Sequence, residues 1–119
     1  MKIGKYGEKI ALKYLKNKGF NIRHTNYHSQ YGEIDIICEN ESFVVFVEVK
    51  SKLHNSQSTL FERINNSKKA KIIKTIYDYS SKHQIDKQPR IDVIEIEIFE
   101  IYHRIKHTKN AFEANYGFF

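Results

Sequence analysis

The chain has 119 residues, of which 40% are hydrophobic and 29% are charged. This length suits one domain with a single core, and the composition excludes a disordered protein. The formal net charge of +6 favours a polyanionic partner such as a nucleic acid, although many small basic proteins bind none. The single cysteine, Cys38, excludes an internal disulfide and Cys-rich zinc sites. No apolar run has the length of a signal peptide or membrane span, so we expect a cytoplasmic protein without a membrane partner.

The first predicted element is a helix from Ile3 to Lys18. It ends before Gly19, a residue type favoured just beyond a helix C-terminus. Four lysines share one face of the helical wheel: Lys5, Lys9, Lys13 and Lys16. This face either follows a phosphate backbone or is simply solvated. Glu8 falls on the apolar face instead, where an acid needs a cation or hydrogen-bond donors to hold it.

Three strands are expected next. The first is short, from Phe20 to Thr25. The other two, Glu33–Cys38 and Phe43–Lys50, are joined by the polar stretch Glu39–Ser42, which is typical of a β-hairpin. The third strand is apolar on both faces, as in a buried central strand.

A polar segment from Ser51 to Thr59 precedes the second predicted helix. Ser67 is the expected N-cap, and the helix continues to about His83. Its apolar residues recur at helical spacing: Ala70, Ile73, Ile76 and Tyr77.

The last third of the chain is expected to form strands. Gln84–Pro89 is predicted to be a loop, followed by an alternating strand at Ile91–Phe99 and another at Tyr102–Ile105. The tail, Asn110–Phe119, carries no clear pattern. The order α-β-β-β-α-β-β predicts an α/β fold, with one domain over residues 1–119 and a mixed sheet flanked by helices.

The charged residues of the predicted hairpin carry the chemistry. Because residues two apart share a side of a strand, Glu33 lies on the side of Asp35, and Glu48 on the side of Lys50. A hairpin joint with an even number of residues sets all four side chains on one face, whereas an odd joint separates the pairs. Clustered carboxylates repel one another unless a cation neutralises them, and Mg²⁺ or Mn²⁺ prefers such oxygen ligands.

These residues predict a metal site of the nuclease type. A metal ion held there can lower the pKa of a bound water and stabilise the charge that builds on a phosphodiester. Lys50 points towards the same place and can orient or deprotonate that water. The alternative is a set of cross-strand ion pairs on a solvated sheet face.

Two segments, G-E-I-D-I-I from Gly32 and V-F-V-E-V-K-S-K from Val45, resemble the YraN-type family of predicted bacterial nucleases. That family is distantly related to the archaeal Holliday-junction resolvases of the PD-(D/E)xK superfamily. The resemblance covers nearly the whole chain and extends to further segments: Gly7-Glu8, Asn26, Lys68, Arg90–Ile94 and Asn110–Phe112. It implies a restriction-endonuclease-like fold and Mg²⁺- or Mn²⁺-dependent hydrolysis of DNA, in branched or recombination-type structures.

By position, the resemblance implies that Asp35 and Glu48 are metal ligands. Lys50 would be the catalytic lysine, Glu8 the helix acid that completes the site, and Glu33 a further ligand or supporting acid. Four lysines are the candidate nucleic-acid contacts: Lys5, Lys9, Lys52 and Lys68. The resolvase relatives act as dimers, so a homodimer is also implied.

Two other functions stay open at this point. One is a nucleic-acid-binding module of the same fold with little or no cleavage, and the other is an assembly factor that binds a protein partner. Elsewhere, Asp92 is interpreted as a structural partner of Arg90, and His103 and His107 as surface residues. Cys38 is expected to be packed in the core.

Overall fold

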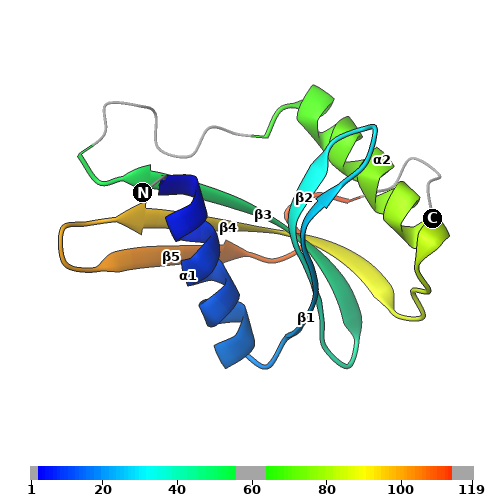
Figure 1. Cartoon of the computed structure of the whole chain (residues 1–119), viewed down its shortest axis with the longest axis horizontal. Coiled ribbons are helices and arrows are strands. Elements are labelled where there is room, and N and C mark those ends of the chain that lie inside the picture. The colour runs from blue at the N-terminus through cyan, green and yellow to red at the C-terminus, as the bar shows by residue number, and fades with distance from the viewer. Residues whose placement is uncertain (1–2, 56–63, 114–119) are drawn as a thin grey trace.

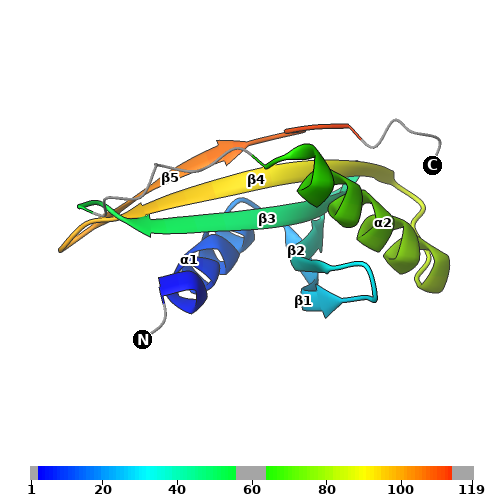
Figure 2. The ribbon, with the colours of Figure 1, turned by 90° about the horizontal axis from the view of Figure 1, so that it is seen from above.

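The computed structural model describes residues 3–55 and 64–113, which form one five-stranded mixed sheet with two helices (Figures 1 and 2). In chain order the elements are α1 (Ile3–Asn17), β1 (Asn21–His28), β2 (Glu33–Glu39), β3 (Phe43–Leu53), α2 (Asn66–Lys82), β4 (Gln88–Ile98) and β5 (His103–Thr108). The predicted α/β class and order of elements are confirmed. The arrangement is compatible with a restriction-endonuclease-like fold.

The strands are ordered β1-β2-β3-β4-β5 across the sheet. Only β3 and β4 run parallel, and α2 makes the crossover between them. The other neighbouring strands pair antiparallel. β3 therefore lies in the middle of the sheet, with β2 on one side and β4 on the other.

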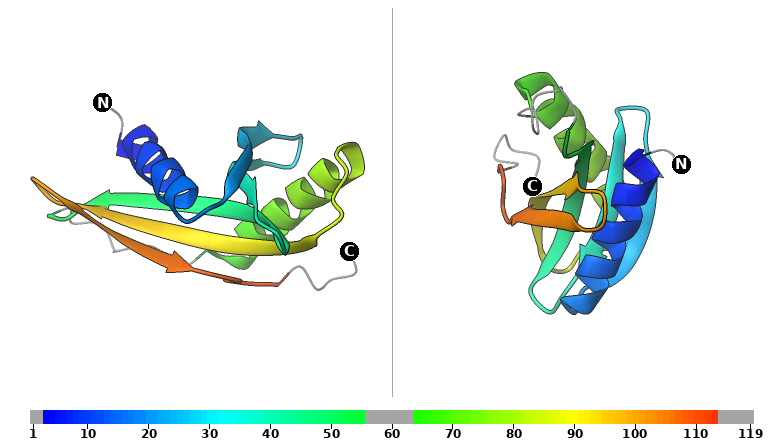
Figure 3. Two further views of the ribbon diagram at one scale, coloured as in Figure 1. Left: turned by 90° about the horizontal axis from the view of Figure 1, so that it is seen from below. Right: turned by 90° about the vertical axis from the view of Figure 1, so that its left-hand side faces the viewer.

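The two helices cover opposite faces of the sheet (Figure 3). α1 packs Ala11 and Leu15 into a core that includes Val45 and Val47 of β3. α2 packs against the opposite face. There Val44 and Phe46 of β3 form the second core with Ile73, Ile76 and Tyr79 of α2. This two-sided burial of β3 agrees with its apolar sequence.

Several strands differ at their ends from the prediction. β3 continues to Leu53 because its parallel pairing with β4 extends to Ile98. β4 begins at Gln88, within the predicted loop, and β5 lies at His103–Thr108. β1 continues to His28 in antiparallel pairing with β2. Residues 56–59 of the predicted polar segment and residues 114–119 of the tail lie outside the described ranges.

α2 also corrects two predictions. Its N-cap is Asn65 rather than Ser67, since the Asn65 Oδ1 accepts a hydrogen bond from the Lys68 backbone N–H at 2.8 Å. Its buried face is rotated from the predicted one, so that Thr75 and Tyr79 are buried while Tyr77 is exposed. In residues 3–55 and 64–113, no helix is both long and apolar enough to cross a bilayer.

Candidate metal centre

The hairpin between β2 and β3 meets the parity condition set by the sequence. The backbone N–H of Asn40 donates to the Phe43 carbonyl at 3.0 Å, so the turn itself consists of Glu41 and Ser42. The Asn40 side chain shapes this turn by accepting from the N–H groups of Ser42 and Phe43, both at 2.9 Å. The joint is even, and cross-strand neighbours therefore share a face of the sheet.

β2 and β3 part just before the acids. Their pairing ends at Ile36 and Val47, and the next residues are Asp35 on β2 and Glu48 on β3. The Val49 backbone N–H donates to Asp35 Oδ2 at 2.7 Å. The Asp35 carboxylate thus satisfies a donor of β3 at the place where the two strands separate.

α1 approaches this point closely because residue 7 is a glycine. A Cβ atom at Gly7 would lie 2.8 Å from Ser51 Cβ on β3 and closer still to Ser51 Oγ. No larger residue fits without a shift of Ser51. The next residue, Glu8, lines a cavity of about 200 Å³ together with Asp35, and two predicted nucleic-acid contacts line it as well: Lys5 and Lys9.

The opposite side of the cluster opens under α2. A cavity of about 350 Å³ there is lined by Glu33, Glu48 and Lys68 among others. Lys68 Nζ lies 2.9 Å from Glu48 Oε1, and the Glu48 side chain is only 12% exposed. Glu33 is more exposed and lies 3.3 Å from His28 Nδ1. The acids therefore line two cavities, one under each helix, whereas the sequence predicted that they share one face of the sheet.

The electrostatics tie these acids together. Burial raises the pKa of Asp35 to about 7, and the Glu48 carboxylate is the next largest cause. Glu8 and Glu33 raise it further, while the Val49 N–H lowers it. All three other predicted acids thus act on Asp35. Without a cation, Asp35 holds a proton close to neutral pH.

Two lysines lie in the field of the acids. Burial lowers the pKa of Lys50, and the neighbouring Lys68 lowers it further, whereas Glu48 and Asp35 oppose this change. For Lys68, burial lowers the pKa, but its hydrogen bond with Glu48 and the nearby acids outweigh burial and raise it overall. Lys50 is therefore placed beside both predicted ligands. Its ammonium group gives up a proton more easily than an exposed lysine does.

Carboxylate oxygens are the ligands that a hard divalent cation prefers. Asp35 and Glu48 would hold it, and Glu33 or Glu8 would support the site. Within the described ranges, no three His, Cys, Asp or Glu side chains already converge as a ready-made ligand set. Mg²⁺ commonly takes only one or two carboxylates and fills its other positions with water and substrate phosphate. The remaining predicted contact, Lys52, is partly buried on β3.

A second cluster, a single buried acid with its hydrogen-bond partners, was predicted only in part. Asp92 on β4 is completely buried and accepts from Arg90 Nε and Nη2, both at 2.9 Å. It also lies 2.7 Å from His107 Nε2 and accepts from the Asn110 N–H at 3.0 Å. The predicted Arg90–Asp92 pair is confirmed, but the surface placement of His107 is wrong, since its side chain is 6% exposed. His103 is exposed as predicted.

Cys38 is buried as predicted, and burial raises its thiol pKa to about 12.

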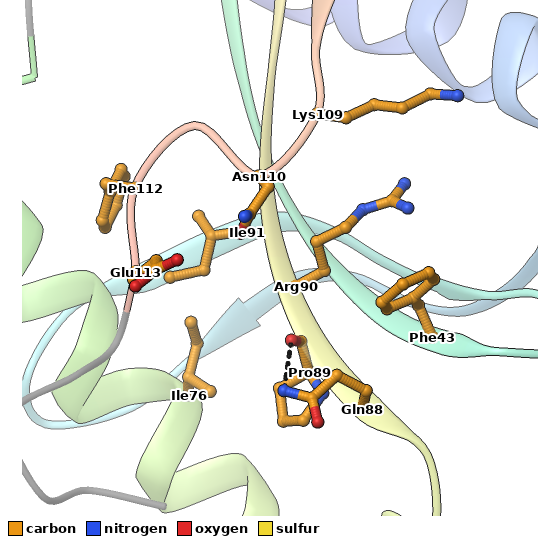
Figure 4. Close-up of a pocket in the computed structure, with 10 residues that line it drawn as sticks. All are labelled: Phe43, Ile76, Gln88, Pro89, Arg90, Ile91, Lys109, Asn110, Phe112 and Glu113. Carbon is orange, nitrogen blue, oxygen red and sulfur yellow. Dashed lines mark hydrogen bonds between the residues drawn. The ribbon is translucent and has the colours of Figure 1, made fainter.

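A cavity of about 530 Å³ lies away from the acid cluster, and none of the predicted site residues lines it (Figure 4). In Figure 4 the Arg90 side chain extends away from Ile76 and Phe112 of the cavity wall. Arg90 lies over the Phe43 ring at 4.6 Å and is already bonded to Asp92. We assign no catalytic role to this cavity.

Comparison with known proteins identifies similar chains. The model of the "Uncharacterised protein family UPF0102" matches residues 7–96, a range that contains the acids, Lys50 and Lys68. A UPF0102 protein of Alkaliphilus oremlandii is 40% identical, over 93% of this chain and 97% of its own length. Another, of Persephonella marina, is 43% identical over 95% of both chains, and one of Clostridioides difficile is 41% identical over 92% of this chain and 95% of its own length. Their names state no activity.

Proposed function

The chain belongs to the uncharacterised protein family UPF0102, and we propose that it is a divalent-metal-dependent nuclease that hydrolyses DNA phosphodiester bonds. The acid–lysine cluster at the parting of β2 and β3 carries the proposal. Asp35, Glu48 and Lys50 meet there, and the other acids raise the pKa of Asp35. The resemblance of the same segments to the YraN-type nucleases of the PD-(D/E)xK superfamily supports it.

Each residue of the cluster would have its own role in hydrolysis. Asp35 and Glu48 would hold Mg²⁺ or Mn²⁺, which when bound supplies an acidified water and a counter-charge for the phosphate. Lys50 would take a proton from the attacking water or stabilise the negative charge on the reacting phosphorus group. Glu8 faces Asp35 from α1 and would help to orient the water.

The surrounding lysines suit a phosphate backbone. Lys5 and Lys9 line the cavity under α1, while Lys68 and Lys71 line the cavity under α2. Positive charge thus flanks the acids on both sides, as a strand of DNA crossing the cluster requires. Paired cuts in a branched DNA would need two copies of the chain, so we also propose a homodimer. A DNA substrate agrees with the cytoplasmic location expected from the sequence.

One observation favours a second function. Glu48 is already paired with Lys68, and the described residues hold no ready-made ligand trio. A protein with this arrangement could bind DNA and not cleave it. The two functions differ in what Lys50 does, since a mere binding module needs it for no chemistry.

A cleavage assay separates them. The purified protein is incubated with linear, flapped and four-way DNA, and with RNA, in the presence of Mg²⁺ or Mn²⁺. We expect Lys50→Ala and Asp35→Ala to lower the cleavage rate by about 10² to 10⁴, because each removes a group that acts in the reaction. DNA affinity should change by less than a few-fold, as one lost phosphate contact at most allows.

Lys106→Ala is the matched control, since Lys106 is an exposed lysine on β5 that lines neither of the two cavities beside the acids. It should cleave like the wild type. If the wild type binds DNA but cleaves no substrate with either metal, the nuclease proposal fails and the binding module is left.

A further inference from the structure

Lys68 forms an ion pair with Glu48, one of the two predicted metal ligands. We propose that the Lys68 ammonium is a built-in counter-ion of Glu48, which the incoming divalent metal displaces and which then turns to the substrate phosphate. This inference rests on the proposed function and adds a role that the family resemblance does not assign. Lys68 would thus be a positioning residue that couples metal binding to DNA binding.

Among the residues that the structure describes, the acid paired with Lys68 is Glu48. Its Nζ lies 2.9 Å from Glu48 Oε1, a charge-assisted contact. The Lys68 backbone is fixed because its N–H donates to the Asn65 side chain at the start of α2. Only the side chain is therefore free to change its position.

The side chain has room to move. The Lys68 side chain is 43% exposed, whereas that of Glu48 is 12% exposed. The cavity of about 350 Å³ beside the pair is lined mainly by polar side chains, Ser67 and Lys71 among them, and in addition by Ile72. Lys68 can therefore leave Glu48 without crossing apolar packing, while Glu48 stays at the parting of the strands.

Charge makes the two cations mutually exclusive at Glu48. A divalent ion bound to Glu48 would lie within a few ångströms of the Lys68 ammonium, which is already beside Lys50. Like charges at such distances repel one another at the dielectric of a protein surface. The metal therefore binds with less repulsion when Lys68 has moved into the cavity, where a phosphate oxygen is its natural partner.

Titration with Mn²⁺, followed by calorimetry, tests the displacement without any need for cleavage. We expect Lys68→Met to bind Mn²⁺ about fivefold more tightly than the wild type, the ratio that corresponds to loss of a partly exposed ion pair. Lys68→Arg should bind like the wild type or more weakly, since it keeps the charge. Methionine retains the length of the apolar stem and so disturbs the packing of α2 least.

Two neighbouring lysines are matched controls. Lys71 lines the same cavity, and Lys71→Met should raise Mn²⁺ affinity less than twofold. Lys69 lies over the Phe112 ring at 5.4 Å, so Lys69→Met should leave Mn²⁺ affinity unchanged. If Lys68→Met gains no more affinity than Lys71→Met, the inference is overturned while the metal site stands. If neither the wild type nor any variant binds Mn²⁺, both the inference and the proposed metal site fail.

DNA binding gives a second, independent signature. With Ca²⁺ as a metal that is expected to bind without supporting cleavage, Lys68→Met should weaken DNA binding several-fold more than it does in EDTA. The reason is that Lys68 reaches phosphate only after the metal has released it. Lys71→Met should weaken binding equally in both conditions. An equal loss for Lys68→Met in Ca²⁺ and in EDTA would overturn the coupling and leave Lys68 as an ordinary ion pair.

Discussion

Two aspartates on interior strands of this sheet have opposite surroundings. Asp92 on β4 accepts hydrogen bonds from Arg90 and from the Asn110 N–H, and it lies 2.7 Å from His107. Burial alone would raise its pKa, but these partners hold the pKa below the usual value. Asp35 on β2 accepts from one backbone N–H, has three carboxylates nearby, and has a pKa raised to about 7.

The difference lies in the partners rather than in burial. Asp92 is the more buried of the two, yet its charge is fully compensated within the protein. The Asp35 charge is compensated only in part, and its neighbours add to the repulsion. An acid of the first kind holds a fold together, whereas an acid of the second kind is ready for a cation or a proton from outside.

The largest test of this contrast is removal of Asp92. Asp92→Ala leaves the Arg90 guanidinium, whose side chain is 11% exposed, without its partner and takes an acceptor from His107. We expect a loss of about 3–5 kcal/mol in the free energy of unfolding, as for a buried pair broken on one side. Chemical denaturation measures this loss.

Asp35→Ala is the matched variant, an aspartate removed from an interior strand of the same sheet. Without metal it should unfold at the same denaturant concentration as the wild type or at a higher one, because it relieves repulsion among the acids. Equal destabilisation by the two variants would show that Asp35 is a structural residue as well.

The contrast also separates what the sequence could predict from what it could not. Strand alternation and the helical wheel are local rules, and they predicted that Glu8, Asp35 and Glu48 lie near one another but not that the acids line two cavities, one under each helix. The burial of His107 was missed because β5 is an exposed edge strand, and the ring is buried by partners from other elements, Tyr14 of α1 and Asp92 of β4.

Contacts between residues far apart in the chain were likewise not predicted from the sequence. Lys68 was predicted as a nucleic-acid contact. Nothing in its own segment indicates a pair with Glu48, which lies on the preceding strand, β3. Gly7 belongs to the segments that resemble the family, but the reason for a glycine there, the close approach of Ser51 on β3, depends on tertiary packing. The chemistry of a strand was thus predictable from the strand, and its partners from other elements were not.

The pH dependence of stability gives a test of intermediate size. The pKa of Asp35 is raised from its ordinary value of 3.8 to about 7 in the folded protein. The protonated acid therefore contributes stability that is fully present below about pH 4 and is lost as the pH rises through 7. Between pH 5 and pH 8 in EDTA, we expect the wild type to lose on the order of 2 kcal/mol relative to Asp35→Asn, after allowance for solvent screening.

Denaturation curves of both proteins at the two pH values measure this difference. Saturating Mn²⁺ should reduce the loss at pH 8, because the metal replaces the proton in compensating the acids. Parallel pH profiles of wild type and Asp35→Asn would mean that Asp35 carries no raised pKa, and the contrast with Asp92 would then disappear.

The smallest expected effect tests whether the two regions are independent, since α1 contacts both. Tyr14 Oη lies 2.9 Å from His107 Nδ1, and Glu8 on the same helix lines the cavity with Asp35. A carboxylate can only accept, so His107 carries its hydrogen on Nε2 towards Asp92, and in the neutral ring Nδ1 accepts from the Tyr14 phenol. Burial raises the pKa of Tyr14, which keeps that phenol a donor.

Tyr14→Phe should therefore cost about 1 kcal/mol in unfolding free energy, the usual loss for one hydrogen bond, and leave Mn²⁺ affinity unchanged within twofold. A larger change in Mn²⁺ affinity would show that α1 transmits the state of the Asp92 cluster to the acids around Asp35, and the two aspartates could then no longer be treated as separate.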